Sequence, residues 1–520
     1  MKLSLTNPSP SQAATHKFLK ASTKRLLINN EWVESSGSDP IPTLDPATGE
    51  TLGYIQSATK SDVDAAVSAA RTAFKSGEWP NMTPSARGQL LWKMAELIEA
   101  NIDELAELET LDQGKPLYVG RWAEIPGAAE QFRYFGGMAT KIQGSTIPSS
   151  IAYQPEGKKV FAYTNKEPIG VVAAIVPWNS PLVLTAMKLA PALAAGCTVV
   201  LKPAENTSLT AIRLGELFVE AGFPPGVLNI VTGYGHTTGA ELAAHMDVDK
   251  VSFTGSTRTG RAILDAAKGN LKKVTLELGG KSPVIVLDDA DLNYATPGAA
   301  NAIFFNGGQV CIAGSRLYAQ SRVFDKVVEG LSEAANAMQL GHGLDPNTQM
   351  GPLVSKAQAD SVSGFITRAK KAGASILTGG ERDSCFISPT VVADVKQDME
   401  IVQEEVFGPV ITCTRFDDIS EVADLSNNSH YGLAASVWTE SLSSAHRLAA
   451  DIRAGTVWIN SHAMYDASLP IGGVKQSGWG RDSGAQAIEN YLEEKTICAC
   501  LLYTSPSPRD LSTSRMPSSA

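Results

Sequence analysis

The stretch Ile169-Gly170-Val171-Val172-Ala173-Ala174-Ile175-Val176-Pro177-Trp178 decides the fold. Its apolar run lacks the alternation of a half-exposed strand and is typical of a strand buried on both faces of a parallel sheet. The run is also too short to cross a bilayer, so no membrane span is predicted. A helix over residues 182–195 and a second apolar strand over 198–201 follow it. Strand, helix and strand in this order indicate a βαβ unit.

The same alternation continues along the chain. The next predicted elements are a helix over 209–221, a strand over 227–231, a helix that ends near His245, and a strand over 251–254. A second α/β unit begins near Gly280 and contains a helix through Ala300 and strands over 284–287, 316–319 and 410–414. This pattern predicts two open, doubly wound parallel sheets. Two such units leave a cleft between them, where an active site is expected.

The N-terminal part shows weaker patterns. Residues 25–32 predict a strand and turn, residues 61–76 an amphipathic helix with Asp62 near its N-cap, and residues 84–111 a pair of amphipathic helices. The first thirty residues contain no acidic side chain and a single arginine. We interpret residues 1–24 as a disordered arm. A mitochondrial transit peptide is the alternative, and the two early prolines argue against it.

Composition excludes several classes of protein. The chain has 520 residues, 43% of them hydrophobic, with a formal net charge of −10. This is globular composition, long enough for two or three domains. An acidic chain without blocks of Lys and Arg is not expected to bind nucleic acid. Six irregularly spaced cysteines make no disulfide framework and favour a reducing, cytoplasmic location. No metal site is predicted, because neither C-x-x-C nor His-x-x-x-His spacing occurs.

Two separate motifs carry candidate chemistry. Cys311 ends the Gly-rich turn Phe304-Phe305-Asn306-Gly307-Gly308-Gln309-Val310-Cys311, and Glu277 lies upstream in Leu276-Glu277-Leu278-Gly279-Gly280. A thiol nucleophile and a carboxylate that activates water are the parts needed to oxidise an aldehyde through a thioester. The side-chain amide of Asn179 can donate to the oxyanion. The structural alternatives are a buried apolar cysteine, a helix N-cap at Asn179, and a solvent-facing strand residue at Glu277.

These motifs, in the order Asn179, Glu277, Cys311, resemble the aldehyde dehydrogenase superfamily over about residues 26–500. The resemblance implies two Rossmann-like α/β domains with a β-hairpin arm. The implied divisions are an NAD-binding domain over 25–143 and 167–278, a catalytic domain over 279–484, and a bridging arm over 144–166 and 485–500. In the family such an arm joins subunits, which implies a homodimer or homotetramer.

The resemblance also implies a mechanism. Cys311 attacks the aldehyde, hydride transfer leaves a thioester, and Glu277 activates the water that hydrolyses it to an acid. Lys188 matches a residue that relays the proton outward. The family's Gly-Arg-Glu segment appears here as Gly480-Arg481-Asp482. Aspartate is one methylene shorter, so a relay role for Asp482 stays open. The presence of Glu277 favours a free acid over an acyl-CoA product.

Cofactor residues come from several segments. The turn Gly255-Ser256-Thr257-Arg258-Thr259-Gly260 links a predicted strand to a helix and can cradle a phosphate. By resemblance Gly255, Ser256 and Gly260 bind the pyrophosphate. Lys202 and Glu205 are expected on a ribose, where the carboxylate of Glu205 repels a 2′-phosphate and favours NAD over NADP. NADP remains an alternative. The resemblance adds four more cofactor-binding residues: Trp178, Leu278, Glu405 and Phe407.

The resemblance suggests residues that line the aldehyde pocket: Ser180, Val183, Leu184, Met187, Val310, Ile312 and Ile471. Several relatives carry aromatic side chains at the positions of Ser180 and Ile471. The smaller side chains here predict a wide, apolar mouth that prefers bulky aliphatic or aromatic aldehydes. Two rival functions are a cysteine-dependent esterase or acyl-transfer enzyme without cofactor and a non-catalytic structural protein on this fold. The retained cofactor motifs and reactive side chains argue against both.

The last twenty residues, 501–520, are rich in Ser, Pro and Thr and depart from the family pattern. Such a composition does not form a packed element. We interpret the segment as a frameshift or a read-through of vector sequence, with a genuine disordered tail as the alternative.

Overall fold

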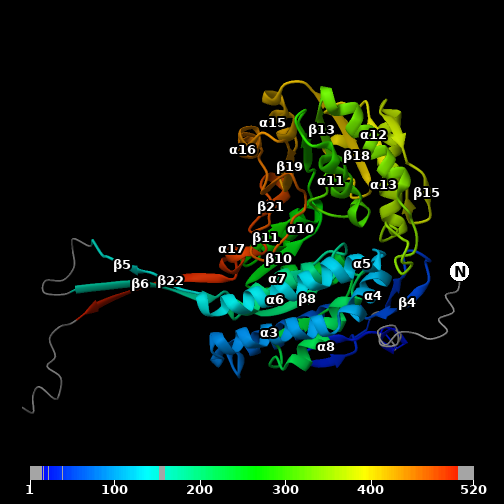
Figure 1. The fold of residues 1–520 in the computed structure, drawn as a ribbon. Helices are drawn as coiled ribbons and strands as arrows, with labels where there is room; N and C mark the ends of the chain where they lie inside the picture. The colour runs from blue at the N-terminus through cyan, green and yellow to red at the C-terminus, as the bar shows by residue number, and fades with distance from the viewer. Residues whose placement is uncertain (1–14, 16, 21–22, 38, 151–158, 502–520) are drawn as a thin grey trace, which may run out of the picture.

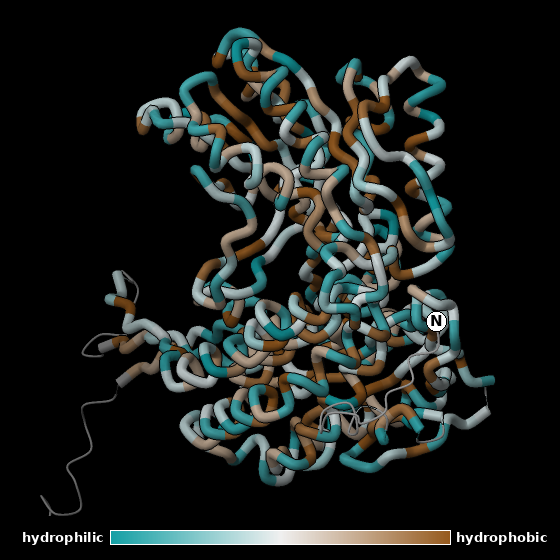
Figure 2. Tube along the Cα trace, turned by 45° about the vertical axis from the view of Figure 1, so that its right-hand side comes forward, coloured by the Kyte–Doolittle hydropathy of each residue, from teal (hydrophilic) through white to brown (hydrophobic). Residues whose placement is uncertain are grey.

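The computed structural model describes residues 15, 17–20, 23–37, 39–150 and 159–501. Two α/β lobes lie one above the other, and a long β-arm projects from the lower lobe (Figure 1). Hydrophobic segments gather inside both lobes and hydrophilic segments lie toward the outside (Figure 2). The predicted fold of two doubly wound sheets with a β-arm is confirmed. No helix within the described residues is long and apolar enough to cross a membrane.

The lower lobe contains an eight-stranded sheet in the order β2-β1-β9-β8-β7-β10-β11-β21. Strands β7 to β11 are parallel, while β1 and β21 pair antiparallel with their neighbours. The alternating elements are β7 (Val171–Ile175), α7 (Pro181–Ala195), β8 (Thr198–Lys202), α8 (Leu209–Ala221), β9 (Leu228–Ile230), α9 (Ala240–Ala244), β10 (Lys250–Thr254), α10 (Thr257–Ala267) and β11 (Lys273–Glu277). The elements from β7 to β10 lie within a few residues of their predicted ranges, whereas β11 was not predicted as a separate strand.

Helices from the N-terminal part cover this sheet. They are α2 (Lys60–Lys75), α3 (Pro84–Ala100), α4 (Ile102–Gln113), α5 (Leu117–Val119) and α6 (Ile125–Met138), and the strands before them are β1 (Leu26–Ile28), β2 (Glu31–Val33), β3 (Ile41–Leu44) and β4 (Thr51–Ile55). The N-cap of α2 is Thr59, and Asp62 completes a capping box as its N3 residue. Part of the predicted disordered arm 1–24 is ordered: residues 17–20 are helical and Phe18 is buried in a hydrophobic cluster. The rest of that arm lies largely outside the described residues.

The upper lobe contains a seven-stranded sheet in the order β14-β17-β18-β13-β12-β19-β20, parallel except for β14. Its strands are β12 (Pro283–Val286), β13 (Arg316–Gln320), β14 (Ser375–Thr378), β17 (Thr390–Ala393), β18 (Val410–Phe416), β19 (Ala434–Trp438) and β20 (Thr456–Ile459). Its helices are α11 (Leu292–Phe304), α12 (Ser321–Ala337), α13 (Lys356–Lys371), α14 (Glu400–Gln403), α15 (Ile419–Asn427) and α16 (Leu442–Asp451).

The chain returns to the lower lobe near its end. Strand β21 (Gly478–Trp479) pairs with the end of β11, and α17 (Gly484–Glu489) packs against α7. The predicted catalytic domain 279–484 therefore includes one strand that belongs to the sheet of the nucleotide-binding domain. This return brings residues near 480 to the end of β11, where Glu277 lies.

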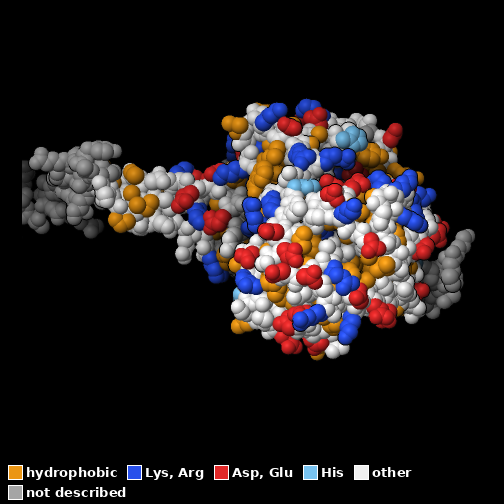
Figure 3. All heavy atoms as spheres, turned by 90° about the horizontal axis from the view of Figure 1, so that it is seen from above, with side chains coloured by type: hydrophobic (Ala, Val, Ile, Leu, Met, Phe, Trp, Pro, Cys, Tyr) orange, Lys and Arg blue, Asp and Glu red, His pale blue; other side chains and the backbone are white. Residues whose placement is uncertain are grey.

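The arm is a three-stranded antiparallel sheet of β5 (Thr146–Ile147), β6 (Lys159–Pro168) and β22 (Leu492–Leu501). Strands β6 and β22 pair over their full ten residues. The side chains of Ile147 and Phe161 are exposed on it, and hydrophobic side chains are visible along the projecting arm (Figure 3). Residues 151–158 and the predicted non-native tail from residue 502 lie outside the described residues.

Candidate active site

The turn that carries Cys311 has an unusual backbone. Helix α11 ends at Phe304, and Asn306, Gly307 and Gly308 then adopt positive φ angles of 49°, 61° and 69°. A Cβ on Gly308 would overlap the carbonyl oxygen of Gly408, so this left-handed position also requires glycine for space. The turn leaves Cys311 partly exposed, at the junction of the two lobes.

The environment of the Cys311 thiol favours its neutral form. Burial, together with the negative charges of Glu405 and Glu277, raises the pKa of Cys311 to about 12. The backbone N–H groups of Ile312 and of Cys311 itself act in the opposite direction. The thiol must therefore give up a proton to become a nucleophile, and the two backbone N–H groups are the donors that stabilise the thiolate.

Glu277 is the last residue of β11 and is buried, with 9% of its surface exposed. Burial raises its pKa well above the usual value, the charge of Asp482 raises it further, and Lys188, Arg481 and the Gly473 N–H lower it. Its Oε1 atom has no hydrogen-bond partner among the described residues. The alternative of a solvent-facing strand residue is thus wrong, and a buried carboxylate of raised pKa is suited to accept a proton.

A buried ion pair lies behind Glu277. Lys188 of α7 donates to Asp482, with 2.9 Å between Nζ and Oδ2, and the two side chains are 1% and 6% exposed. Asp482 is held in place by a bridge between its backbone and that of Ile471. The sequence left a role for Asp482 open, and the structure pairs it with the predicted relay residue.

Asn179 is buried between β7 and α7. Its backbone carbonyl accepts a hydrogen bond of 3.1 Å from Nδ2 of Asn306, which ties this segment to the cysteine turn. The N-cap of α7 is Ser180, so the alternative that Asn179 caps the helix is wrong. The structure therefore joins the Asn179 and Cys311 segments although 132 positions of sequence separate them.

The predicted pyrophosphate turn is hydrogen-bonded to the backbone of Glu277. Ser256 is the N-cap of α10 and accepts from the N–H of Thr259 at 3.2 Å, and Gly255 donates from its N–H to the Glu277 carbonyl at 3.0 Å. A Cβ on Gly260 would lie 2.7 Å from a methyl carbon of Leu278, so glycine lets α10 approach that residue. Glycine at position 260 therefore lets the first turn of α10 pack closely on Leu278, and the N-terminal N–H groups of this helix are of the kind that bind a phosphate.

The predicted ribose residues lie at the end of β8. Lys202 donates to the Pro203 carbonyl at 2.7 Å and pairs with Glu205 at 3.3 Å between Nζ and Oε2. Burial lowers the pKa of Lys202, and the Glu205 charge opposes this. The pair forms an amine and a carboxylate side by side at the strand end where open α/β sheets bind ligands.

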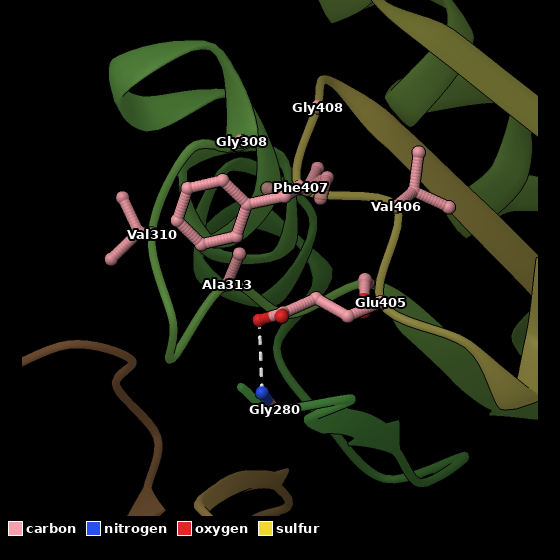
Figure 4. Close-up of a pocket in the computed structure, with 10 residues that line it drawn as sticks. Gly280, Gly308, Val310, Ala313, Glu405, Val406, Phe407 and Gly408 are labelled. Atoms are coloured by element: carbon pink, nitrogen blue, oxygen red, sulfur yellow. Dashed lines mark hydrogen bonds between the residues drawn. The ribbon is translucent and has the colours of Figure 1, made fainter. Parts of the chain in front are cut away.

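Glu405 and Phe407, two of the predicted cofactor-binding residues, line a small pocket together with Gly308 and Val310 of the cysteine turn (Figure 4). Glu405 accepts from the Gly280 N–H at 2.9 Å, and burial raises the pKa of Glu405 to about 7. A Cβ on Gly279 would overlap the same carboxylate. The ring of Phe407 lies edge-to-face against Trp178, with 5.2 Å between centroids. The three segments that carry Glu405 and Phe407, Gly279 and Gly280, and Trp178 therefore meet at one place.

The predicted aldehyde-pocket residues fall into two groups. Val310, Ile312 and Ile471 share one hydrophobic cluster with Cys311. Ser180, Val183, Leu184 and Met187 lie at the start of α7 and are not members of that cluster. Ser180 donates to Glu124 at 2.9 Å, and Val183 faces Gly127 of α6.

Two groups near the site were missed from the sequence. His462 contacts the carbonyl of Ile312, next to the nucleophile, and Glu124 lies beside Ser180 in a buried ion pair with Lys115. An isolated histidine after an apolar strand carries no local pattern that indicates such a contact. The positive φ angles of Asn306, Gly307 and Gly308 do have a sequence signal, because Asn and Gly are the residues that most readily adopt positive φ.

The comparisons with known proteins show similarity over nearly the whole chain. The phenylacetaldehyde dehydrogenase of Pseudomonas fluorescens is 47% identical over 478 residues, which cover 91% of this chain and 95% of that protein. The aldehyde dehydrogenase family 2 member C4 of Arabidopsis thaliana is 45% identical, covering 93% and 96%. The NAD+ complex of an aldehyde dehydrogenase from Bacillus cereus superposes with a TM-score of 0.92 at 46% identity, covering 95% and 99%.

These similarities define the class as oxidoreductases that act on aldehydes with NAD(P). The sequence model of the Aldehyde dehydrogenase family matches residues 32–497 of this chain. The chain belongs to the aldehyde dehydrogenase family, as its sequence motifs predicted.

Proposed function

We propose that this protein oxidises bulky apolar aldehydes to carboxylic acids with NAD+, through a thioester on Cys311 that Glu277 helps to hydrolyse. The observation that carries the proposal is the convergence at Cys311. A partly exposed thiol lies close enough to the buried Glu277 for their charges to interact, and the Asn179 segment is bonded to the same turn. A cysteine nucleophile, a general base and an amide donor are the groups that this reaction requires.

The steps follow from the positions of these groups. The Cys311 thiolate adds to the aldehyde carbon, and the oxyanion accepts from the Asn179 amide and the Cys311 N–H. NAD+ held by the cofactor residues would supply the hydride acceptor, and Cys311 would then carry the acyl group as a thioester. Glu277 then takes a proton from water, and the hydroxide releases the acid and the thiolate. The buried pair of Lys188 and Asp482 is placed to take the proton from Glu277.

The residues of the cofactor site fit a dinucleotide. The start of α10 follows the turn from Gly255 and offers backbone N–H groups for a phosphate, and the carboxylate of Glu205 lies just after the end of β8. A carboxylate accepts from ribose hydroxyl groups and repels a 2′-phosphate. We therefore propose NAD as the preferred cofactor, with NADP as a weaker alternative. The NAD+ complex of the similar Bacillus cereus enzyme supports this proposal.

The proposed substrate class rests on the apolar wall beside Cys311. Val310, Ile312 and Ile471 line this wall with aliphatic side chains, and none of them can pair with a substrate carboxylate. The similarity to a phenylacetaldehyde dehydrogenase supports an aromatic or bulky aliphatic aldehyde.

The arm supports an oligomer. Strands β6 and β22 project from the lobe, and Ile147 and Phe161 expose 43% of their surfaces. An extended sheet with exposed apolar side chains is stabilised when another chain covers it. We propose a homodimer or homotetramer. We also propose a cytoplasmic location, because all six cysteines are free.

The test is NADH formation by the purified protein with a panel of aldehydes, with NAD or NADP, beside Cys311→Ala. We expect turnover that is lost in the variant, while the variant still binds NAD by fluorescence. Hydrolysis of a p-nitrophenyl ester without any cofactor reduction would favour the esterase alternative. No turnover of either kind, with intact NAD binding, would favour the structural alternative.

A further inference from the structure

His462 lies behind the turn that carries the nucleophile. Its Nε2 is 2.8 Å from the carbonyl oxygen of Ile312, and its Nδ1 is 2.9 Å from Oγ of Ser436. The ring is 5.0 Å from that of Trp458, measured between centroids. Ser436 belongs to β19 and Trp458 to β20, so the histidine connects two strands of the upper sheet to the residue after Cys311.

The two hydrogen bonds fix the tautomer of the ring. A carbonyl oxygen can only accept, so Nε2 carries the proton and donates to Ile312. Burial lowers the pKa of His462 to about 4, so the ring is neutral at neutral pH. The unprotonated Nδ1 therefore accepts from the hydroxyl of Ser436, which is itself fully buried. The side chain of Ser436, in the sheet of the upper lobe, thus sets the orientation of the Nε2–H donor of His462.

Ile312 is the residue whose placement matters most to the thiol. Its backbone N–H is one of the two donors that lower the pKa of Cys311, and its carbonyl is held by His462. Among the residues that the structure describes, no other side chain hydrogen-bonds to the backbone of residues 310–313. A Cβ on the nearby Gly314 would lie 3.3 Å from the His462 ring, so the ring packs closely under the turn.

We propose that His462 is a positioning residue for the nucleophile: it anchors the Ile312 carbonyl so that the Ile312 N–H stays directed at the Cys311 sulfur. The proposal rests on the proposed function, in which that sulfur is the nucleophile. It assigns no proton transfer to His462. A donor on Nε2 is required, and the bond from Ser436 keeps that donor in the correct orientation.

Three variants separate positioning from packing. Gln at position 462 can place an amide N–H near the position of Nε2, whereas Asn reaches only about as far as Nδ1. His462→Gln therefore retains the donor to Ile312, His462→Asn retains only a partner for Ser436, and His462→Leu retains neither. His446→Gln on the exposed face of α16 is the matched control.

The first measurement is the rate of alkylation of Cys311 by iodoacetamide across a range of pH, in the full-length protein without cofactor. The Cys311 peptide is followed by mass spectrometry, because Cys498 and Cys500 are also exposed. For His462→Asn and His462→Leu we expect reaction about tenfold slower at neutral pH, with the pH profile displaced upward by about one unit. We expect His462→Gln to stay within about threefold of wild type.

Steady-state kinetics and stability complete the test. In His462→Asn we expect kcat to fall with the alkylation rate while the affinity for NAD and the melting temperature stay near those of wild type. Equal losses in the Gln and Asn variants, or a wild-type alkylation profile in His462→Leu, would overturn the proposal. Alkylation needs no aldehyde, so a failure of the proposed function leaves this result interpretable.

Discussion

Replacing Asp482 by Asn tests the electrostatic account of Glu277. Asp482 pairs with Lys188 at 2.9 Å in a buried site, and its negative charge is the second cause, after burial, of the raised pKa of Glu277. The variant removes this like charge and leaves Lys188 positive and unopposed. Both changes favour the ionised form of Glu277, so its pKa must fall.

The magnitude follows from the position of these groups. Loss of one close like charge at a buried carboxyl shifts its pKa by about one unit. The acid limb of the pH profile for thioester hydrolysis should therefore move to lower pH by about one unit, because Glu277 is active when ionised. A weaker base is also a poorer catalyst, so the plateau rate should fall. Removing one partner of a buried pair costs about 3 kcal/mol of folding free energy, less if the Asn carbonyl still accepts from Lys188.

The assay follows hydrolysis of the acyl-enzyme formed from a p-nitrophenyl ester, over a range of pH and without cofactor, so that hydride transfer does not contribute. Urea unfolding measures the stability cost. Asp482→Glu is the matched control: it keeps the charge, and its acid limb should stay near that of wild type. An unmoved acid limb in Asp482→Asn, or one that moves to higher pH, would refute the reasoning.

Four further predictions concern other parts of the molecule. Gly308→Ala should reduce kcat more than about a hundredfold, because the new Cβ would overlap the Gly408 carbonyl at a backbone position with a φ of 69°. Gly307→Ala is the control, because its Cβ meets no such overlap and costs only backbone strain. Equal losses of kcat in the two variants would contradict this explanation. Glu205→Gln should lower the ratio of kcat/KM for NAD over NADP by about tenfold, and an unchanged ratio would argue against a role of the carboxylate in cofactor choice. Ile471→Phe should lower kcat/KM for phenylacetaldehyde about tenfold relative to acetaldehyde, and a parallel change for both would remove the side chain from the pocket. Phe161→Lys on the arm should yield a smaller species by light scattering, whereas an unchanged mass would exclude this face from the subunit contact.

The fold was predictable from local patterns. The buried strands of the lower lobe are short apolar runs followed by a polar, glycine or proline residue, and the ends of β7, β8 and β10 fall within one residue of the expected positions. Helix α8 has the predicted bounds, because Gly222 adopts a left-handed conformation directly after it. Asp62 was predicted near the N-cap of α2, and it is the N3 residue of the capping box, with Thr59 as the N-cap. Aspartate is common at both positions, so the residue type alone does not distinguish them.

The site was predictable only in part. Cys311, Glu277 and Asn179 stand in motifs, so their residue types and neighbours identified them. The pairing of Lys188 with Asp482 spans 294 positions and the contact of His462 with Ile312 spans 150. Such contacts depend on how strands and loops that are distant in sequence meet within a lobe, and a single sequence carries no register between distant elements.

The return of the chain to the lower lobe has a consequence for how the protein is made. Strand β21 closes the edge of the first sheet beside β11, and Asp482 follows it only three residues later. On the ribosome the first lobe emerges long before this strand, with the β11 edge uncovered and Lys188 without its counter-charge. Domains fold as units during synthesis, N-terminal first. We therefore expect folding of the nascent lower lobe to be completed only after nearly the whole polypeptide has been translated.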